Sequence, residues 1–355
     1  MEVLWFIIPL LFIKHVIGNS SLKQVHIAFR HGERAPSSTF TNDPYINYSW
    51  PNGWGELTNR GKLQLYLLGE NIRREYEEFI PKLYWYKDVN ITSSYYVRCQ
   101  MSGQLFTAGL YPPVGDLIWN PDLLWQPIPL IYLPRSRDTN IVMKAPCAKY
   151  DKILKEIRQT PGIVEIENKY QNLKDYLTKH TGQNITNIED IESVYNTLEI
   201  EQLHNFTLPN WLNNSMMATM KKLGARNLAL YSETQFMKKV KGGMFLNNAI
   251  KCMENRLKGS DETLLYLYSV HDLTLVHILR SLELVDSIKP DFGATLVFEL
   301  YENGEIKVKY RNFWSDKPTI WAIPNCDSPC ILNDFKNSLM NVLCFDYIKE
   351  CELNS

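Results

Sequence analysis

The sequence FRHGERAP, from Phe29 to Pro36, completes a run of alternating apolar and polar residues that begins at Leu22. Such a run is typical of a buried β-strand. Packing does not explain why a buried strand should end in Arg30, His31 and Arg34. Guanidinium groups present rigid forks of donors that match phosphate oxygens, and an imidazole held between them could attack the phosphorus. The stretch therefore predicts a phosphate site at the carboxyl end of a strand.

A second strand is predicted from Leu264 to Val270. Its nearly continuous apolar sequence is typical of a central strand that is buried on both faces. His271 and Asp272 follow it, and a helical pattern begins there. Two interpretations of this dipeptide are open, because Asp272 is also a suitable N-cap for the helix.

A third strand is predicted from Val89 to Val97, and Arg98 follows it directly, before a helical pattern that includes Met101. Arg98 thus lies at a strand-to-helix turn. Ligands of doubly wound α/β folds collect at the carboxyl ends of the strands, where a guanidinium can bind phosphate. From the pattern alone, an ordinary surface arginine is the alternative.

Together these stretches resemble the histidine acid phosphatase family. The heptapeptide from Arg30 to Pro36 matches the RHGxRxP signature of that family, and His271-Asp272 matches its HD motif. The run from Trp50 to Gly61 matches a further family segment, W-x-x-G-x-G-x-L-T-x-x-G. The resemblance covers nearly the whole mature chain and is nearest to secreted and lysosomal animal acid phosphatases, including insect venom types. The phytase branch, which tends to carry His-Ala-Glu in place of the HD motif, is a close alternative.

The resemblance also implies a role for each site residue. His31 would be the nucleophile and form a phosphohistidine, and Asp272 would be the proton donor to the leaving alcohol. His271 would take part in catalysis as a further donor to the phosphate. No metal and no cofactor would be needed. The implied phosphate-binding residues are Arg30, Arg34, Arg98 and His271. For Arg98 the sequence departs from the family pattern D-R-T, because Val97 and Cys99 flank the arginine.

The fold implied by the resemblance is α/β, with a doubly wound mixed sheet flanked by helices and a smaller, mainly α-helical inserted domain. The composition agrees in part, since most of the sequence between 151 and 242 is helical in pattern. We expect residues 19–130 and 240–355 to form the catalytic domain and residues 131–239 to form the inserted domain. The resemblance further implies a homodimer.

The N-terminus predicts export. The apolar run from Val3 to Ile13 is shorter than the roughly 20 residues that span a bilayer. With Gly18 behind it, the run resembles a signal peptide over residues 1–18, although Glu2 stands where a basic residue is usual. A buried core helix is the alternative. We expect a secreted, extracellular protein without a membrane anchor, the lysosome being the other candidate location. Glycosylation is predicted at Asn47, Asn90, Asn184, Asn205 and Asn213, each of which begins an N-x-[ST] sequon.

The chain has seven cysteines, and four of them lie near the C-terminus. A zinc site is disfavoured because no paired C-x-x-C or histidine set accompanies them. By resemblance, Cys326 pairs with Cys330 and Cys147 pairs with Cys351. Because seven is odd, at least one thiol is free or pairs between chains. The cysteines left without an assigned partner are Cys99, Cys252 and Cys344.

The composition is that of a globular protein, with 45% hydrophobic residues, 22% charged residues and a formal net charge of −1. This balance gives no support for a nucleic-acid partner. The sequence also lacks a G-x-S-x-G elbow, a Walker loop and an H-E-x-x-H motif. The favoured function is a secreted acid phosphatase that hydrolyses small phosphate monoesters, with phosphopeptides and nucleotides among the candidate substrates. The alternative is a catalytically silent secreted binding protein, such as a venom or salivary component, that keeps the fold.

Overall fold

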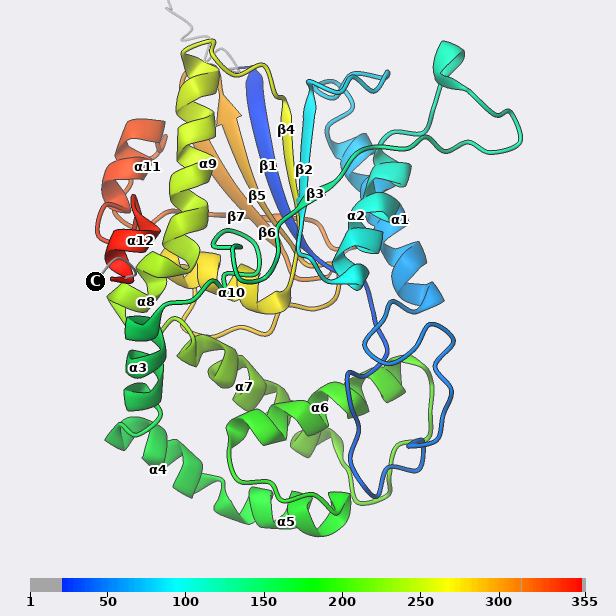
Figure 1. Ribbon diagram of the computed structural model, residues 1–355, viewed down its shortest axis with the longest axis vertical. Helices are drawn as coiled ribbons and strands as arrows, with labels where there is room; N and C mark the ends of the chain where they lie inside the picture. Colours follow the sequence, from blue (N-terminus) through cyan, green and yellow to red (C-terminus); the bar gives the residue numbers. More distant parts are fainter. Residues whose placement is uncertain (1–20, 314, 353–355) are drawn as a thin grey trace, which may run out of the picture.

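The computed structural model describes residues 21–313 and 315–352, so the predicted signal peptide lies outside the described residues. Its centre is a seven-stranded mixed sheet in the order β3-β2-β4-β1-β5-β6-β7 (Figure 1). Strand β1 (Leu22–Arg30) is parallel to β4 (Leu265–Val270) and antiparallel to β5 (Thr295–Tyr301). The predicted mixed α/β sheet is therefore confirmed. The other strands are β2 (Val89–Ser93), β3 (Ile131–Tyr132), β6 (Ile306–Arg311) and β7 (Thr319–Trp321).

Strand β1 contributes alternate side chains to two hydrophobic cores, one on each face of the sheet. Ile27 and Phe29 pack into the core beneath α1 (Asn59–Glu75) and α2 (Val97–Leu110). Ala28 packs into the opposite core, which includes Phe245 of α9 (Gly242–Leu257) and Leu275 of α10 (Asp272–Ser281). Strand β4 is likewise buried on both faces, which explains its nearly continuous apolar sequence.

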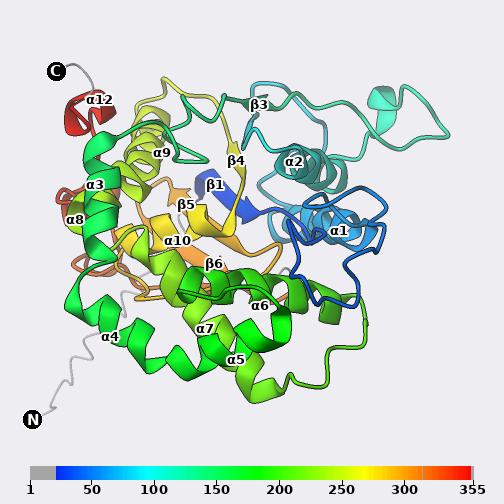
Figure 2. The same ribbon diagram turned by 60° about the horizontal axis from the view of Figure 1, so that its bottom comes forward.

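The parallel pairing of β1 with β4 places the two predicted motifs at the same edge of the sheet. Arg30 is opposite Val270 in the register, and the His31 backbone N–H donates to the Val270 carbonyl over 3.0 Å. The residues that follow the two strands therefore leave the sheet side by side. Figure 2 looks onto this end of the sheet, with α6 and α7 in the foreground.

A group of helices lies beyond the carboxyl end of the sheet (Figure 1). It has its own core, which includes Leu177, Ile188, Leu198 and Met220. The helices of this group are α4 (Pro161–Lys169), α5 (Gln171–Thr181), α6 (Ile188–Leu203) and α7 (Asn214–Leu230). Tyr150 of α3 (Ala148–Ile157) and Met237 of α8 (Gln235–Val240) lie in a separate core that includes Tyr347. The division of the chain into a catalytic and an inserted domain stays a prediction.

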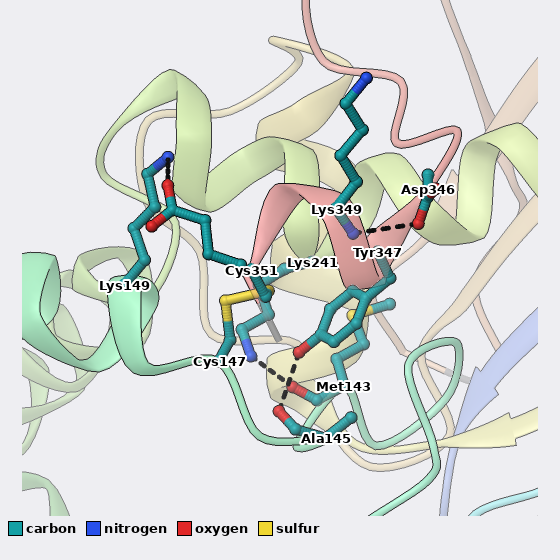
Figure 3. The surroundings of a disulfide bond; sticks show 10 residues. Met143, Ala145, Cys147, Lys149, Lys241, Asp346, Tyr347, Lys349 and Cys351 are labelled. Carbon is teal, nitrogen blue, oxygen red and sulfur yellow. Dashed lines mark hydrogen bonds and ion pairs between the residues drawn. A yellow bond between two sulfur atoms is a disulfide. The ribbon is translucent and has the colours of Figure 1, made fainter. Parts of the chain in front are cut away.

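Two disulfides are present in the structure, Cys147–Cys351 and Cys326–Cys330, and they are the pairs that the resemblance implies. Figure 3 shows the first of them beside two further contacts of the same segment. The Tyr347 hydroxyl donates to the Ala145 carbonyl over 2.8 Å, and Lys241 Nζ donates to the Met143 carbonyl over 2.5 Å. The C-terminal part of the chain is thereby attached to the segment before α3. It includes the short helices α11 (Leu332–Ser338) and α12 (Tyr347–Glu350).

Within residues 21–313 and 315–352, no helix has both the length and the apolar character needed to cross a membrane.

Candidate active site

The loop after β1 is fixed by a close approach to α1 at Gly32. A Cβ atom on Gly32 would lie 2.4 Å from the Gly61 carbonyl oxygen and 2.5 Å from a methyl group of Leu65, so only glycine fits there. On the other side, the Gly32 N–H donates to Ser102 Oγ of α2 over 3.1 Å. These contacts hold the loop between two helices and so set the position of His31.

The His31 ring is oriented for attack by its Nε2 atom. It is almost completely buried, and Nδ1 lies 2.8 Å from the Gly32 carbonyl oxygen. A carbonyl can only accept, so Nδ1 carries the proton and Nε2 has a free lone pair. Burial lowers the pKa of His31 well below its usual value, as do the positive charges of Arg98 and Arg30. The imidazole is therefore neutral, as a nucleophile must be.

Arg30 is held by three groups. Its Nη2 lies 2.8 Å from Asp272 Oδ2, its Nη1 donates to the Pro290 carbonyl over 2.7 Å, and its guanidinium carbon lies 4.0 Å from the centre of the Phe292 ring. The Nε atom is buried and has no partner within the described residues. The side chain is thus fixed in place, and its Nε–H group remains without an acceptor among the described residues.

Arg34 and Arg98 bring further positive charge to the same place. Burial lowers the pKa of Arg34 to about 10, and the charges of Arg98 and Arg30 act in the same direction. Arg98 is the second residue of α2, and its guanidinium carbon lies 4.5 Å from the centre of the Tyr96 ring. Such crowding of like charges is unfavourable alone and favours an anion bound among them.

His271 and Asp272 complete the cluster from the end of β4. The ring centroids of His31 and His271 are 5.5 Å apart, and His271 Nε2 lies 2.8 Å from Ser94 Oγ. The N-cap of α10 is His271, and Asp272 is the first residue of the helix. The interpretation of Asp272 as an N-cap is therefore wrong, and its carboxylate points to Arg30 instead.

The sequence from 21 to 313 matches the family model described as histidine phosphatase superfamily (branch 2). The chain belongs to this superfamily. The prediction of a phosphatase of the histidine type is thus confirmed at the level of the family.

Curated relatives of this histidine phosphatase include two groups of acid phosphatases. The chain is 32% identical to prostatic acid phosphatase of Bos taurus over 342 residues, which is 94% of this chain and 88% of the relative. It is 31% identical to lysosomal acid phosphatase of Homo sapiens over 344 residues, 94% of this chain and 81% of the relative. Among solved structures, a Hafnia alvei phytase in complex with tartrate has a TM-score of 0.70 at 16% identity, covering 94% of this chain and 99% of that one. The phytase likeness concerns the fold.

The Asp272 carboxyl is ionised in this phosphatase. Burial by itself would raise its pKa, but Arg30 and Lys289 outweigh burial and hold the pKa well below its usual range. The neighbouring His271 is neutral, because burial and the charge of Arg98 lower its pKa to about 3. In this motif the Asp272 side chain is thus anionic, whereas the adjacent His271 side chain is neutral.

Sequence reasoning missed the side chains that support the site. Glu33 occupies the variable position of the signature and is buried. Its Oε1 atom lies 2.9 Å from Thr58 Oγ1 and 2.7 Å from His204 Nε2. Its Oε2 atom lies 3.1 Å from Arg60 Nε. His204, the C-cap of α6, thereby connects this helix to the loop that carries His31. The position of Glu33 inside the motif was the available signal. For Ser94 the sequence offers only its place just after β2.

The remaining predicted features are distributed over the surface and the sheet. Within the described parts of the chain, no group of three or more His, Cys, Asp or Glu side chains is placed to hold a metal ion. His180, which was expected to have no ligand role, stacks on Trp211. The sequon asparagines that are exposed are Asn47, Asn184, Asn205 and Asn213, and Asn90 is partly buried within β2.

Proposed function

We propose that this chain is a secreted acid phosphatase that hydrolyses phosphate monoesters through a phosphohistidine at His31, without a metal. The observation that carries the proposal is the meeting of the RHGxRxP loop with the HD motif, joined by the 2.8 Å contact between Arg30 and Asp272. The curated relatives named acid phosphatase support the same reaction class.

In the first step, Arg30, Arg34 and Arg98 bind the phosphoryl oxygens and stabilise the charge that develops on them. His31 Nε2 attacks the phosphorus, a P–N bond forms and the P–O bond to the alcohol breaks. Asp272 gives its proton to the leaving oxygen, so the alcohol departs neutral.

In the second step, the Asp272 carboxylate accepts a proton from water as the water attacks the phosphohistidine. The P–N bond breaks, and the electron pair returns to His31 Nε2. Inorganic phosphate is released, and Asp272 is again protonated for the next cycle.

Acid pH suits this cycle because Asp272 must be protonated before the first step. In the free site Arg30 and Lys289 favour its ionised form. A bound phosphate dianion would compete for the Arg30 guanidinium and place negative charge near the carboxylate, and both effects raise the pKa of Asp272. Substrate binding thus favours the protonated form of Asp272, which the first step requires.

The finer parts of the proposal concern location and assembly. We expect removal of residues 1–18, glycosylation of the exposed sequons, and small phosphomonoester substrates, with phosphopeptides and nucleotides among the candidates. A homodimer is supported by exposed apolar side chains on the edge strand β3 and on the segment before it, where a second copy could cover Trp119, Leu124 and Ile131.

The test is hydrolysis of an aryl phosphate at about pH 5 with a chelator and no added metal, with and without tartrate. We expect turnover by the wild type, inhibition by tartrate and an acid-labile phosphoenzyme after rapid quenching. His31→Ala should lose both turnover and phosphoenzyme, whereas His180→Ala, a histidine that stacks on Trp211, should keep both. A wild type that binds phosphate without turning over would instead support the silent binding protein.

A further inference from the structure

The Ser94 side chain is buried beside His271 and makes few hydrogen bonds. Ser94 follows the last residue of β2 and is completely buried. Its Oγ lies 2.8 Å from His271 Nε2 and accepts from the Tyr96 N–H over 3.3 Å. Among the described residues, the Cys99 thiol is a further hydrogen-bonding neighbour of this hydroxyl.

These contacts decide where the hydroxyl proton goes. The Tyr96 N–H can only donate, so the Ser94 hydroxyl must direct its own hydrogen elsewhere. Cys99 Sγ is the other neighbour of the ring, at 3.6 Å from His271 Nε2, but sulfur is a weak acceptor and this thiol donates to the Val270 carbonyl over 3.7 Å. His271 Nε2 is therefore the acceptor for Ser94.

The state of His271 follows from this assignment. A neutral imidazole has one protonated and one unprotonated nitrogen, and an Nε2 atom that accepts requires the proton to be on Nδ1. His271 is neutral because burial and the charge of Arg98 lower its pKa to about 3. Its Nδ1–H is then the only N–H group of the ring, and so the one that can donate to a substrate oxygen.

We propose that Ser94 is a positioning residue that fixes the tautomer of His271 so that Nδ1–H donates to the substrate phosphoryl group. The inference rests on the proposed function, since it assigns the supporting contact of a phosphate donor in that site. Ser94 acts through His271 and does not touch the substrate.

The first test needs no activity, and it uses a variant only to assign the signals. In protein labelled with 15N at histidine, at about pH 5, the two ring nitrogens of His271 should show a protonated Nδ1 and an unprotonated Nε2. His271→Asn identifies the signals by their loss. A wild-type His271 with the proton on Nε2 would overturn the inference, whatever the activity of the protein.

The second test compares Ser94→Ala with Ser93→Ala. Ser93 is equally buried, and its hydroxyl donates to the Ser94 carbonyl and not to His271. Ser94→Ala should lower kcat/KM for an aryl phosphate and weaken inhibition by inorganic phosphate, each about tenfold, and move the His271 proton toward Nε2. Ser93→Ala should leave the tautomer and both constants near the wild-type values.

The outcomes separate the two proposals. Unchanged kinetics and an unchanged His271 spectrum in a folded Ser94→Ala protein would overturn the role of Ser94 and leave the phosphatase proposal standing. Loss of all activity already in the wild type would overturn the phosphatase proposal, and the tautomer in the wild type would still decide the role of Ser94.

Discussion

Asp272 Oδ2 lies 2.8 Å from Arg30 Nη2, although the two residues are supplied by the ends of different strands. This pair joins the phosphate-binding role of Arg30 to the proton-transfer role of Asp272. A dianion that binds Arg30 weakens the pair and makes the Asp272 carboxyl easier to protonate. The site can therefore hold Asp272 ionised when free and protonated when a substrate is bound.

Replacement of Asp272 by Asn keeps the shape of the side chain and removes its proton. We expect turnover of alkyl phosphates, whose alkoxides are poor leaving groups, to fall about a hundredfold or more, and turnover of p-nitrophenyl phosphate to fall much less. The measurement is kcat for a series of esters with leaving groups of different pKa. An equal loss across the series would rule out Asp272 as the general acid.

Replacement of Arg98 by Ala should change the pH dependence through His31. Burial, then Arg98, then Arg30 lower the pKa of His31, so loss of one cation lets this pKa rise. Protonated His31 is not a nucleophile, and the acid limb of kcat/KM should move to higher pH. Arg137→Ala, which removes an exposed arginine, is the matched control and should not move the limb. An unmoved acid limb in Arg98→Ala would show that His31 does not set it.

Replacement of Glu201 by Gln should change the pH dependence of stability. Glu201 is buried in α6, and burial together with the charge of the buried Asp43 raises its pKa to about 8. Between its usual pKa and pH 8 the folded protein keeps this proton and the unfolded chain loses it. The free energy of unfolding should then fall as pH rises over that interval, by at most about 1.4 kcal/mol per pH unit. Denaturant unfolding from pH 5 to pH 8 should show a shallower slope for Glu201→Gln. An identical slope in both proteins would contradict the assignment.

Replacement of Gly32 by Ala should damage the site by sterics alone. The new methyl group would meet the Gly61 backbone, which cannot move without shifting α1. We expect a loss of about 1–3 kcal/mol in the free energy of unfolding and a large loss of activity. Gly162→Ala in α4 is the control, since a Cβ atom there meets nothing within 4 Å. Thermal unfolding and turnover of the two variants provide the comparison, and a fully active Gly32→Ala protein would contradict the packing described here.

The sequence predicts the framework of the site because hydrophobic patterning defines the two central strands. Once β1 and β4 are recognised as buried and parallel, Arg30 and Val270 must be neighbours, and the motifs that follow must meet. The same reasoning cannot find Glu33 or Ser94. Their roles depend on long-range contacts to His204 and His271, and neither contact leaves a periodic trace in the sequence.

Boundaries were predicted less well than elements. The strand expected from Val89 to Val97 ends at Ser93, because the chain turns there to place Ser94 beside His271 and Tyr96 at the start of α2. Tyr96, within the segment expected to be a strand, instead contacts Arg98 and His271. The strand propensity of residues 94–97 was thus outweighed by the contacts that these residues make near His271 and Arg98.

The Cys147–Cys351 bond encloses a segment of the chain with a sequence separation of 204 residues. His271 and Asp272 lie inside this covalent ring, and His31 lies outside it. A protease that cuts one exposed loop within the ring would therefore release no fragment, and the nicked protein would migrate as one species on a gel without reductant. After a cut within the ring, the disulfide still joins the part that carries Asp272 to the part that carries His31, until the bond is reduced.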